Sequence, residues 1–155
     1  MTGVEMDVTE TVARLLAIEE IERLKARYFR FVDEKRWDEF GELFTEDVVI
    51  DIEGSAQRPR DRAQLVAATR RHYGDALTVH HGHMPEIEII DSDHARGVWA
   101  MVDMIEVPEG GELPSFVGYG HYRDEYRRDG GGWRISRLSL SRIKLDRGPL
   151  TWSAT

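Results

Sequence analysis

Two residues of this sequence, Asp33 and His80, could act together as a base that removes a proton from carbon. Histidine is the side chain that gains and loses a proton closest to neutral pH, so it suits proton abstraction next to a carbonyl group. A carboxylate on the other ring nitrogen would fix the tautomer and stabilise the cation formed during the reaction. The two residues are 47 positions apart (80 minus 33), so only the fold can bring them together.

Asp33 stands at the end of a long helical pattern, residues 10–34. The spacing of three and four residues predicts one buried face, made of Val12, Leu15, Ile18, Ile21, Leu24, Tyr28 and Val32. Because Phe29 and Phe31 crowd the last turn, Asp33 should lie beside the core. We expect an acid in such a place to be paired with another group or to take part in catalysis. The alternative is a helix-end aspartate that meets a neighbouring base, Arg30, Lys35 or Arg36.

His80 is one of three histidines in the segment 77–90, with His81 and His83. In a strand, His80 faces one side while His81 and His83 face the other. Only the last two could share an ion, and no third ligand is evident, so we expect no metal. The sequence also lacks a glycine-rich phosphate loop of the usual spacing, and no other cofactor is expected. The alternative for His80 alone is a hydrogen-bonded core histidine.

Tyr28 and Asp103 are further candidates for binding the substrate. Tyr28 lies five residues before Asp33, about 140° away around an ideal helix, so only its long phenol could converge on the same site. Asp103 shares strand parity with apolar residues, where an acid is costly unless it is paired. The alternatives are a core tyrosine with its hydroxyl at the rim, and a solvated aspartate displaced by a bulge.

The strand expected at 115–128 carries two more candidates, Tyr119 and His121. They share a side with Val117, Arg123 and Glu125, whereas Gly118, Gly120, Tyr122, Asp124 and Tyr126 share the other. Spacing leaves open which side lines a pocket. The charged residues of 123–129 are expected on a solvated face, and Trp99 and Phe116 as packing or pocket walls.

The elements that must position these residues can be predicted in order. Asp7 and Glu10 could form a capping box for the long helix, and a short second helix should end near Phe44. A strand of about six residues follows within 47–54, and then a helix that starts after Asp61, with Leu65, Val66 and Ala68 inward, and stops at Gly74.

From residue 77 the hydrophobic period changes to two. This predicts four long strands joined by short turns, which makes them antiparallel neighbours: 77–90, 94–107, 115–128 and 132–145. The expected fold class is α+β, with the helices packed on one face of a curved, mainly antiparallel sheet.

Composition narrows the function classes. The 155 residues suit one domain, 1–155, with a flexible lead-in at 1–8 and a C-terminal tail at 147–155. The net charge of -8 argues against nucleic acid as a partner, and no apolar run is long enough to span a membrane. Without cysteines or a signal-like N-terminus, a cytoplasmic protein is expected.

Two stretches carry a family resemblance, EEIERLKARYFRFVDEKRWDEFGELFTEDVVID and GHYRDEYRRDGGGWRISRL. They resemble the SnoaL-like group of the nuclear-transport-factor-2-like superfamily, over about residues 10–146. The resemblance implies a cone-shaped α+β barrel that encloses one pocket. Because many members share the fold and not the chemistry, it leaves function open.

The set Tyr28, Asp33, His80 and Asp103 is similar to that of the bile-acid dehydratases. The Asp and His pair also resembles scytalone dehydratase and hexachlorocyclohexane dehydrochlorinase. This implies a cofactor-free lyase acting on a small hydrophobic, cyclic molecule, with His80 as base, Asp33 as its orienter and Tyr28 and Asp103 near the leaving oxygen or carbonyl. It also implies a homo-oligomer, a trimer or a dimer. An isomerase or cyclase, and a non-catalytic binding or dimerisation domain, stay open as alternatives.

Overall fold

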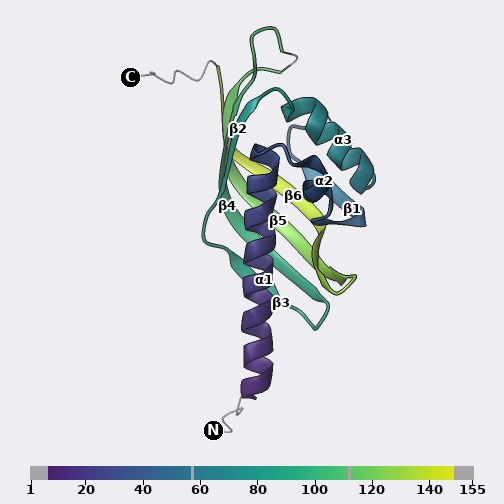
Figure 1. The fold of residues 1–155 in the computed structure, drawn as a ribbon. Helices are drawn as coiled ribbons and strands as arrows, with labels where there is room; N and C mark the ends of the chain where they lie inside the picture. The colour runs from purple at the N-terminus through teal and green to yellow at the C-terminus, as the bar shows by residue number, and fades with distance from the viewer. Residues whose placement is uncertain (1–6, 57, 112, 149–155) are drawn as a thin grey trace.

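The computed structural model describes residues 7–56, 58–111 and 113–148. Within them, three helices pack against an open, mostly antiparallel sheet (Figure 1), which confirms the predicted α+β class. The predicted lead-in lies outside the described residues, except that Asp7 and Val8 already begin the first helix. The predicted tail is described only as far as Gly148.

Helix α1 (Val8–Asp33) runs along the sheet and projects beyond it at its N-terminal end (Figure 1). The Asp7 carboxylate caps it by accepting a hydrogen bond from the Thr9 backbone N–H at 3.0 Å, in place of the expected reciprocal pair with Glu10. The C-terminal half of the helix has the predicted inner face, with Ile21, Leu24, Tyr28 and Val32 buried against the sheet.

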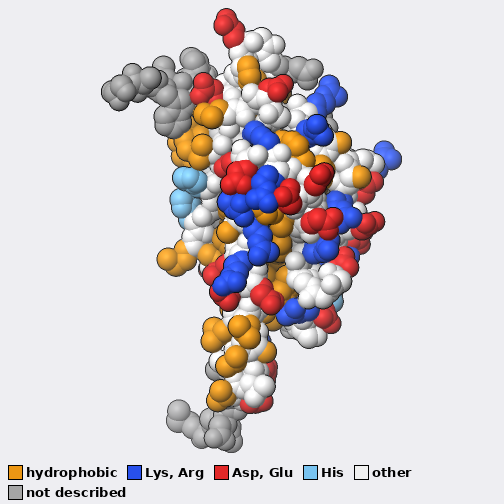
Figure 2. All heavy atoms as spheres, viewed as in Figure 1, with side chains coloured by type: hydrophobic (Ala, Val, Ile, Leu, Met, Phe, Trp, Pro, Cys, Tyr) orange, Lys and Arg blue, Asp and Glu red, His pale blue; other side chains and the backbone are white. Residues whose placement is uncertain are grey.

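The N-terminal half corrects the predicted face, because Val12 and Leu15 are 48% and 60% exposed. Residues three apart lie about 300° apart around a helix, which is about 60° short of a full turn. Three such steps lead from Val12 to Ile21, so these two residues stand on opposite sides of the helix. Val8, Val12, Leu15 and Leu16 are all exposed. Figure 2 shows apolar side chains gathered on this projecting part of α1.

The next three elements place a helical layer at the C-terminal end of α1. Helix α2 (Trp37–Gly41) is shorter than predicted, because Phe44 already starts strand β1 (Phe44–Ile52). Helix α3 (Arg62–Tyr73) begins at its predicted cap, where the Asp61 carboxylate accepts from the Gln64 N–H at 2.8 Å. Of its predicted inner face, Leu65 is buried, and Val66 and Ala68 are partly buried.

The sheet has the order β1-β6-β5-β4-β2, with β3 also beside β4. Its remaining strands are β2 (Leu77–Gly82), β3 (Glu86–Ile89), β4 (His94–Glu106), β5 (Phe116–Asp129) and β6 (Gly132–Arg147). All pairs are antiparallel except β1 with β6. The predicted strand 77–90 is two strands, separated at His83–Pro85, where proline cannot donate to a ladder.

A buried ion pair joins α1 to the inner face of β5. Lys25 Nζ lies 2.6 Å from Asp124 Oδ2, and neither side chain is exposed. The ammonium also lies 3.7 Å from the centroid of the Tyr122 ring, and Tyr126 OH donates to the same carboxylate at 3.2 Å. The prediction of a solvated face at 123–129 is therefore wrong for Asp124, which shares the inward parity of the two tyrosines.

Burial lowers the pKa of Lys25 and raises that of Asp124, while their mutual attraction opposes both shifts. The signal that could have found Lys25 is its place on the helix between Ile21 and Tyr28, two residues of the inner face. A charge at such a position requires an opposite charge from the sheet.

Replacing Lys25 by Met should lower the free energy of unfolding by about 3–5 kcal/mol, because Asp124 would keep an unpaired buried charge. Chemical denaturation measures this. The double variant Lys25→Met, Asp124→Leu should recover most of the loss, and Lys144→Met, at an exposed ion pair, should leave stability unchanged. A Lys25→Met protein as stable as the wild type would contradict the account.

Candidate active site

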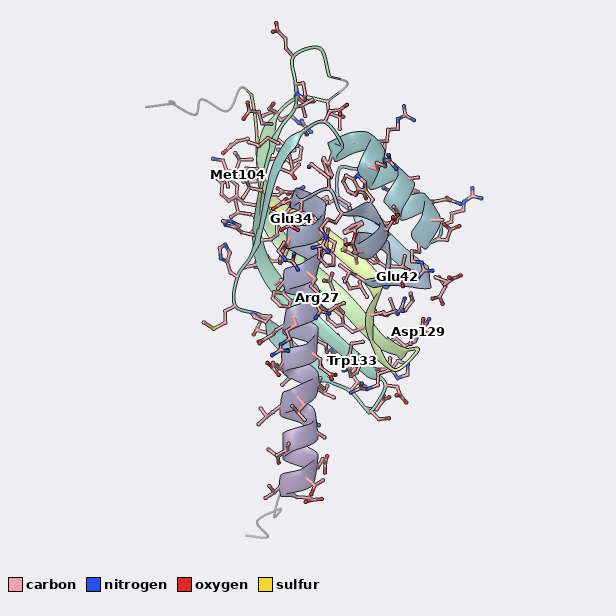
Figure 3. The ribbon with its side chains drawn as sticks, in the orientation of Figure 1. Arg27, Glu34, Glu42, Met104, Asp129 and Trp133 are labelled. Carbon is pink, nitrogen blue, oxygen red and sulfur yellow. The ribbon has the colours of Figure 1, made fainter. Side chains whose placement is uncertain are left out.

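The end of α1 fixes the position of Asp33. The Arg36 N–H donates to the Phe31 carbonyl at 2.8 Å and the Lys35 N–H to the Val32 carbonyl at 3.3 Å, which is the pattern of a Schellman motif. Lys35 is the left-handed residue of this motif, with φ 62°. The chain therefore leaves the helix directly after Asp33, beside β2. Glu34, labelled in Figure 3, marks this end of the helix.

Gly82 of β2 allows the helix to approach the strand closely. A Cβ atom at this position would overlap the ring of Phe29, which lies one turn before Asp33 on α1. Because β2 is the edge strand, its outer backbone groups are free to meet the helix end.

The Asp33 carboxylate accepts three hydrogen bonds from β2. His80 Nδ1 lies 2.7 Å from Oδ1, the His80 backbone N–H donates to Oδ2 at 2.9 Å, and the Thr78 hydroxyl donates to Oδ1 at 2.9 Å. The His80 side chain is 5% exposed and that of Asp33 25%, so the pair reaches the surface on the side of the helix end. The structure thus brings together the two residues that the sequence singled out.

This arrangement leaves one ring nitrogen available for chemistry. With the Nδ1–H donated to Asp33, the lone pair of a neutral imidazole lies on Nε2. Nε2 makes no hydrogen bond to any residue within the described ranges. The ring of Tyr73, at the end of α3, lies 6.0 Å from the imidazole ring, measured between the ring centroids.

Asp103 lies directly opposite His80 in the β2–β4 register. It is 2% exposed and forms a two-pronged ion pair with Arg142, with Nη1 to Oδ1 at 2.7 Å and Nη2 to Oδ2 at 2.9 Å. The alternative of a solvated Asp103 is therefore wrong. Side chains of directly opposed residues share a face, so the ion pair and the imidazole face the same interior.

Sequence reasoning missed Arg142, because strand alternation alone does not show that its side chain faces the interior. A bulge at Ser136 shifts the β5–β6 register between Glu125 and Tyr126, so that Leu138, Leu140 and Arg142 face inward after it. The buried Asp103 was itself a signal, since an acid on an apolar face requires a base.

Gly118 makes room for this ion pair. It is paired with Asp103 across β4 and β5, and a Cβ atom there would overlap Arg142 Nη1 and Asp103 Oδ1. Phe116 lies at the side of the pair, with its ring centroid 5.6 Å from the guanidinium carbon of Arg142.

Three tyrosines line the same interior. Tyr28 and Tyr122 bring their hydroxyl oxygens within 3.5 Å of each other, although Tyr28 does not contact Asp33 among the described interactions. Burial raises the pKa of Tyr28 far above its ordinary value. Burial and the nearby Asp103 carboxylate raise the pKa of Tyr73 to about 12. These phenols are protonated at neutral pH and can donate hydrogen bonds.

Two predicted pocket residues lie on the wrong side of the sheet. Gly118, Gly120 and Tyr122 face inward, so Tyr119 and His121 point outward, and Tyr119 is 37% exposed. The period of two gives both faces but not which one the helices cover. Trp99 is a buried core residue whose Nε1–H donates to Tyr126 OH at 2.8 Å.

Two hollows of the surface lie away from the Asp33 and His80 pair. One of about 860 Å³ is lined by residues of β3, β4, β5 and β6, and one of about 560 Å³ lies between the end of α3 and residues 107–111. Neither is lined by Asp33 or His80, so the pocket expected inside the cone stays a prediction. In the described part of the chain, no three His, Asp or Glu side chains are grouped as a metal site would require, and no helix is long and apolar enough to cross a membrane.

Comparison with known proteins identifies the family. Residues 13–139 match the model of the SnoaL-like domain, and this chain therefore belongs to that family. The probable cyclase FGR4 of Gibberella zeae is similar to this chain, with 25% identity over 136 residues that cover 79% of this chain and 89% of the relative.

Solved structures show the same fold. A candidate scytalone dehydratase from Novosphingobium aromaticivorans has a TM-score of 0.77 at 20% identity, covering 92% of this chain and 99% of its own. A type 2 hexachlorocyclohexane dehydrochlorinase has a TM-score of 0.79 at 18% identity, covering 94% and 99%. The predicted membership of the SnoaL-like and nuclear-transport-factor-2-like group is confirmed.

Replacing Gly118 by Ala should lower the free energy of unfolding by about 1–3 kcal/mol, because the added methyl group must displace Arg142 or Asp103. Gly132→Ala is the matched control, since a Cβ atom at Gly132 meets nothing within 4 Å. Denaturant titration of both variants measures the difference. Equal stability of the two variants would show that the space at Gly118 is not needed.

Proposed function

We propose that this protein is a cofactor-independent lyase that removes water from a small hydrophobic, cyclic substrate. The observation that carries the proposal is the 2.7 Å contact of His80 Nδ1 with Asp33, which leaves Nε2 as a base. A carboxylate in this position orients the ring and stabilises its cation. General base catalysis of this kind is typically worth about 10² to 10⁴ in rate.

In the proposed elimination, His80 Nε2 takes a proton from the carbon next to a carbonyl group. The electron pair of the broken C–H bond forms a carbon–carbon double bond, and the C–O bond of the leaving hydroxyl group breaks. The proton held by His80 then passes to the departing oxygen, which leaves as water. Atoms and electrons balance without an oxidant or a reductant.

The groups that face the same interior can stabilise the charge that develops on oxygen. Arg142 keeps a cation there, because Asp103 holds its guanidinium with two hydrogen bonds. The protonated phenols of Tyr28 and Tyr73 are further donors for a carbonyl or a leaving oxygen. Donors that are already oriented in a buried site supply much of the stabilisation in such reactions.

The second candidate is an isomerase or cyclase that uses the same base. The similarity to the probable cyclase FGR4 favours it. In that reaction the proton taken by His80 returns to another atom of the substrate, and nothing is expelled. The structural neighbour that acts on hexachlorocyclohexane, a ring compound, supports a cyclic substrate in either case.

Replacing His80 by Ala, or Asp33 by Asn, should reduce turnover by about 10² to 10⁴, because the first change removes the base and the second favours the wrong tautomer. A screen of hydroxy-ketone and hydroxy-enoyl compounds for water loss supplies the substrate, and circular dichroism checks the fold.

The matched control is His81→Ala, which removes the adjacent exposed histidine of β2 from the opposite face. It should keep wild-type activity. If His80→Ala turned over the same substrate at the wild-type rate, His80 would not be the base. Product that retains the oxygen, with the proton moved within the molecule, would favour the isomerase.

A further inference from the structure

Thr78 links a third group to the dyad. Lys35 Nζ lies 2.8 Å from Thr78 Oγ1, which in turn lies 2.9 Å from Asp33 Oδ1. An ammonium group can only donate, and an ionised carboxylate can only accept. The hydroxyl therefore accepts from Lys35 and gives its single proton to Asp33, so the direction of both hydrogen bonds is fixed.

The two hydrogen bonds from Lys35 to Thr78 and from Thr78 to Asp33 form a relay. It ends on Asp33 Oδ1, the oxygen that also binds the imidazole. Asp33 Oδ1 receives both the Thr78 hydroxyl and His80 Nδ1, whereas Oδ2 binds the His80 backbone N–H. Any charge that Thr78 draws from Oδ1 is withdrawn from the same atom that would stabilise the His80 cation.

Lys35 occupies a backbone position that favours glycine. Its φ of 62° is the only left-handed one at a non-glycine residue between Asp7 and Gly148, leaving aside the two undescribed positions in that range. A lysine here costs conformational energy that glycine would avoid. Burial lowers the pKa of Lys35, and the charge of Asp33 opposes this shift. Lys35 is therefore strained and partly desolvated, and its ammonium group donates to Thr78. These costs indicate that its side chain has a role at the site.

We propose that Lys35 is a positioning residue that acts through Thr78 to hold Asp33 Oδ1 and to moderate its negative charge toward His80. The effect of this relay on catalysis rests on the function proposed above. The two hydrogen bonds of the relay do not depend on a substrate. The other charged or titratable groups around the imidazole are Tyr73 of α3 and the Asp103 and Arg142 pair of β4 and β6.

The test is the resonance of the His80 Nδ1 proton in substrate-free protein labelled with ¹⁵N-histidine, assigned by its loss in His80→Ala. Lys35→Gly removes the amine and keeps the left-handed turn, so it should fold. The resonance should move downfield, because Asp33 Oδ1 becomes a stronger acceptor for His80. Arg36→Gln removes a neighbouring charge that pairs with Glu39 instead, and should leave the resonance in place.

The order of the relay gives a second readout. Lys35 acts on Asp33 through Thr78, and its charge also reaches Asp33 directly. Adding Lys35→Gly to Thr78→Val should therefore cause a much smaller shift than Lys35→Gly causes alone, and Thr78→Ser should keep the wild-type resonance. An unmoved resonance in Lys35→Gly, or a Lys35→Gly effect as large in the Thr78→Val protein as in the wild type, would overturn the proposal. These results do not depend on turnover, so failure of the relay and failure of the proposed lyase activity are distinguishable.

Discussion

The carboxylate of Asp33 is the interaction on which the candidate site depends. β2 is an edge strand, and the outward N–H of His80 would lack a partner in the sheet. Asp33 satisfies that N–H with one oxygen and the His80 ring with the other, so one side chain both docks the end of α1 and orients the imidazole. The Schellman turn after Asp33 and the missing side chain of Gly82 are what allow the helix end to come this close.

Two further acids inside the fold follow a common rule. Asp124 is paired with Lys25 from α1, and Asp103 with Arg142 from β6. Each base comes from a different element than its acid, so each ion pair depends on the packing of helix on sheet or of strand on strand. Because burying an unpaired charge is costly, both pairs restrict how these elements can slide against one another. The second pair also places a fixed cation on the face that carries His80.

The sequence alone predicted the fold class and most of the order of elements, because helical and strand periods are local signals. An acid beside a core marked Asp33, but its pairing with His80, 47 positions away, was expected on the family resemblance as well. The sequence did not predict Arg142, since a bulge at Ser136 decides which residues of β6 face inward. Lys25 was missed although it lies on the predicted inner face of α1, because a charged residue breaks the apolar pattern that marks such a face. Tyr119 and His121 were misplaced for the related reason that a period of two does not say which face is covered. The split of 77–90 at Pro85 was readable in principle, because proline interrupts a ladder.

The role of His80 as a carbon base can be tested most directly without the leaving group. A ketone analogue of the substrate that lacks the hydroxyl group cannot eliminate water, yet it can still lose and regain its acidic proton. In D₂O, the wild-type protein should exchange that proton for deuterium, as followed by NMR, and His80→Ala should not. Exchange that continues unchanged in His80→Ala would contradict the account, as would a wild-type protein that turns over the full substrate without exchanging the analogue.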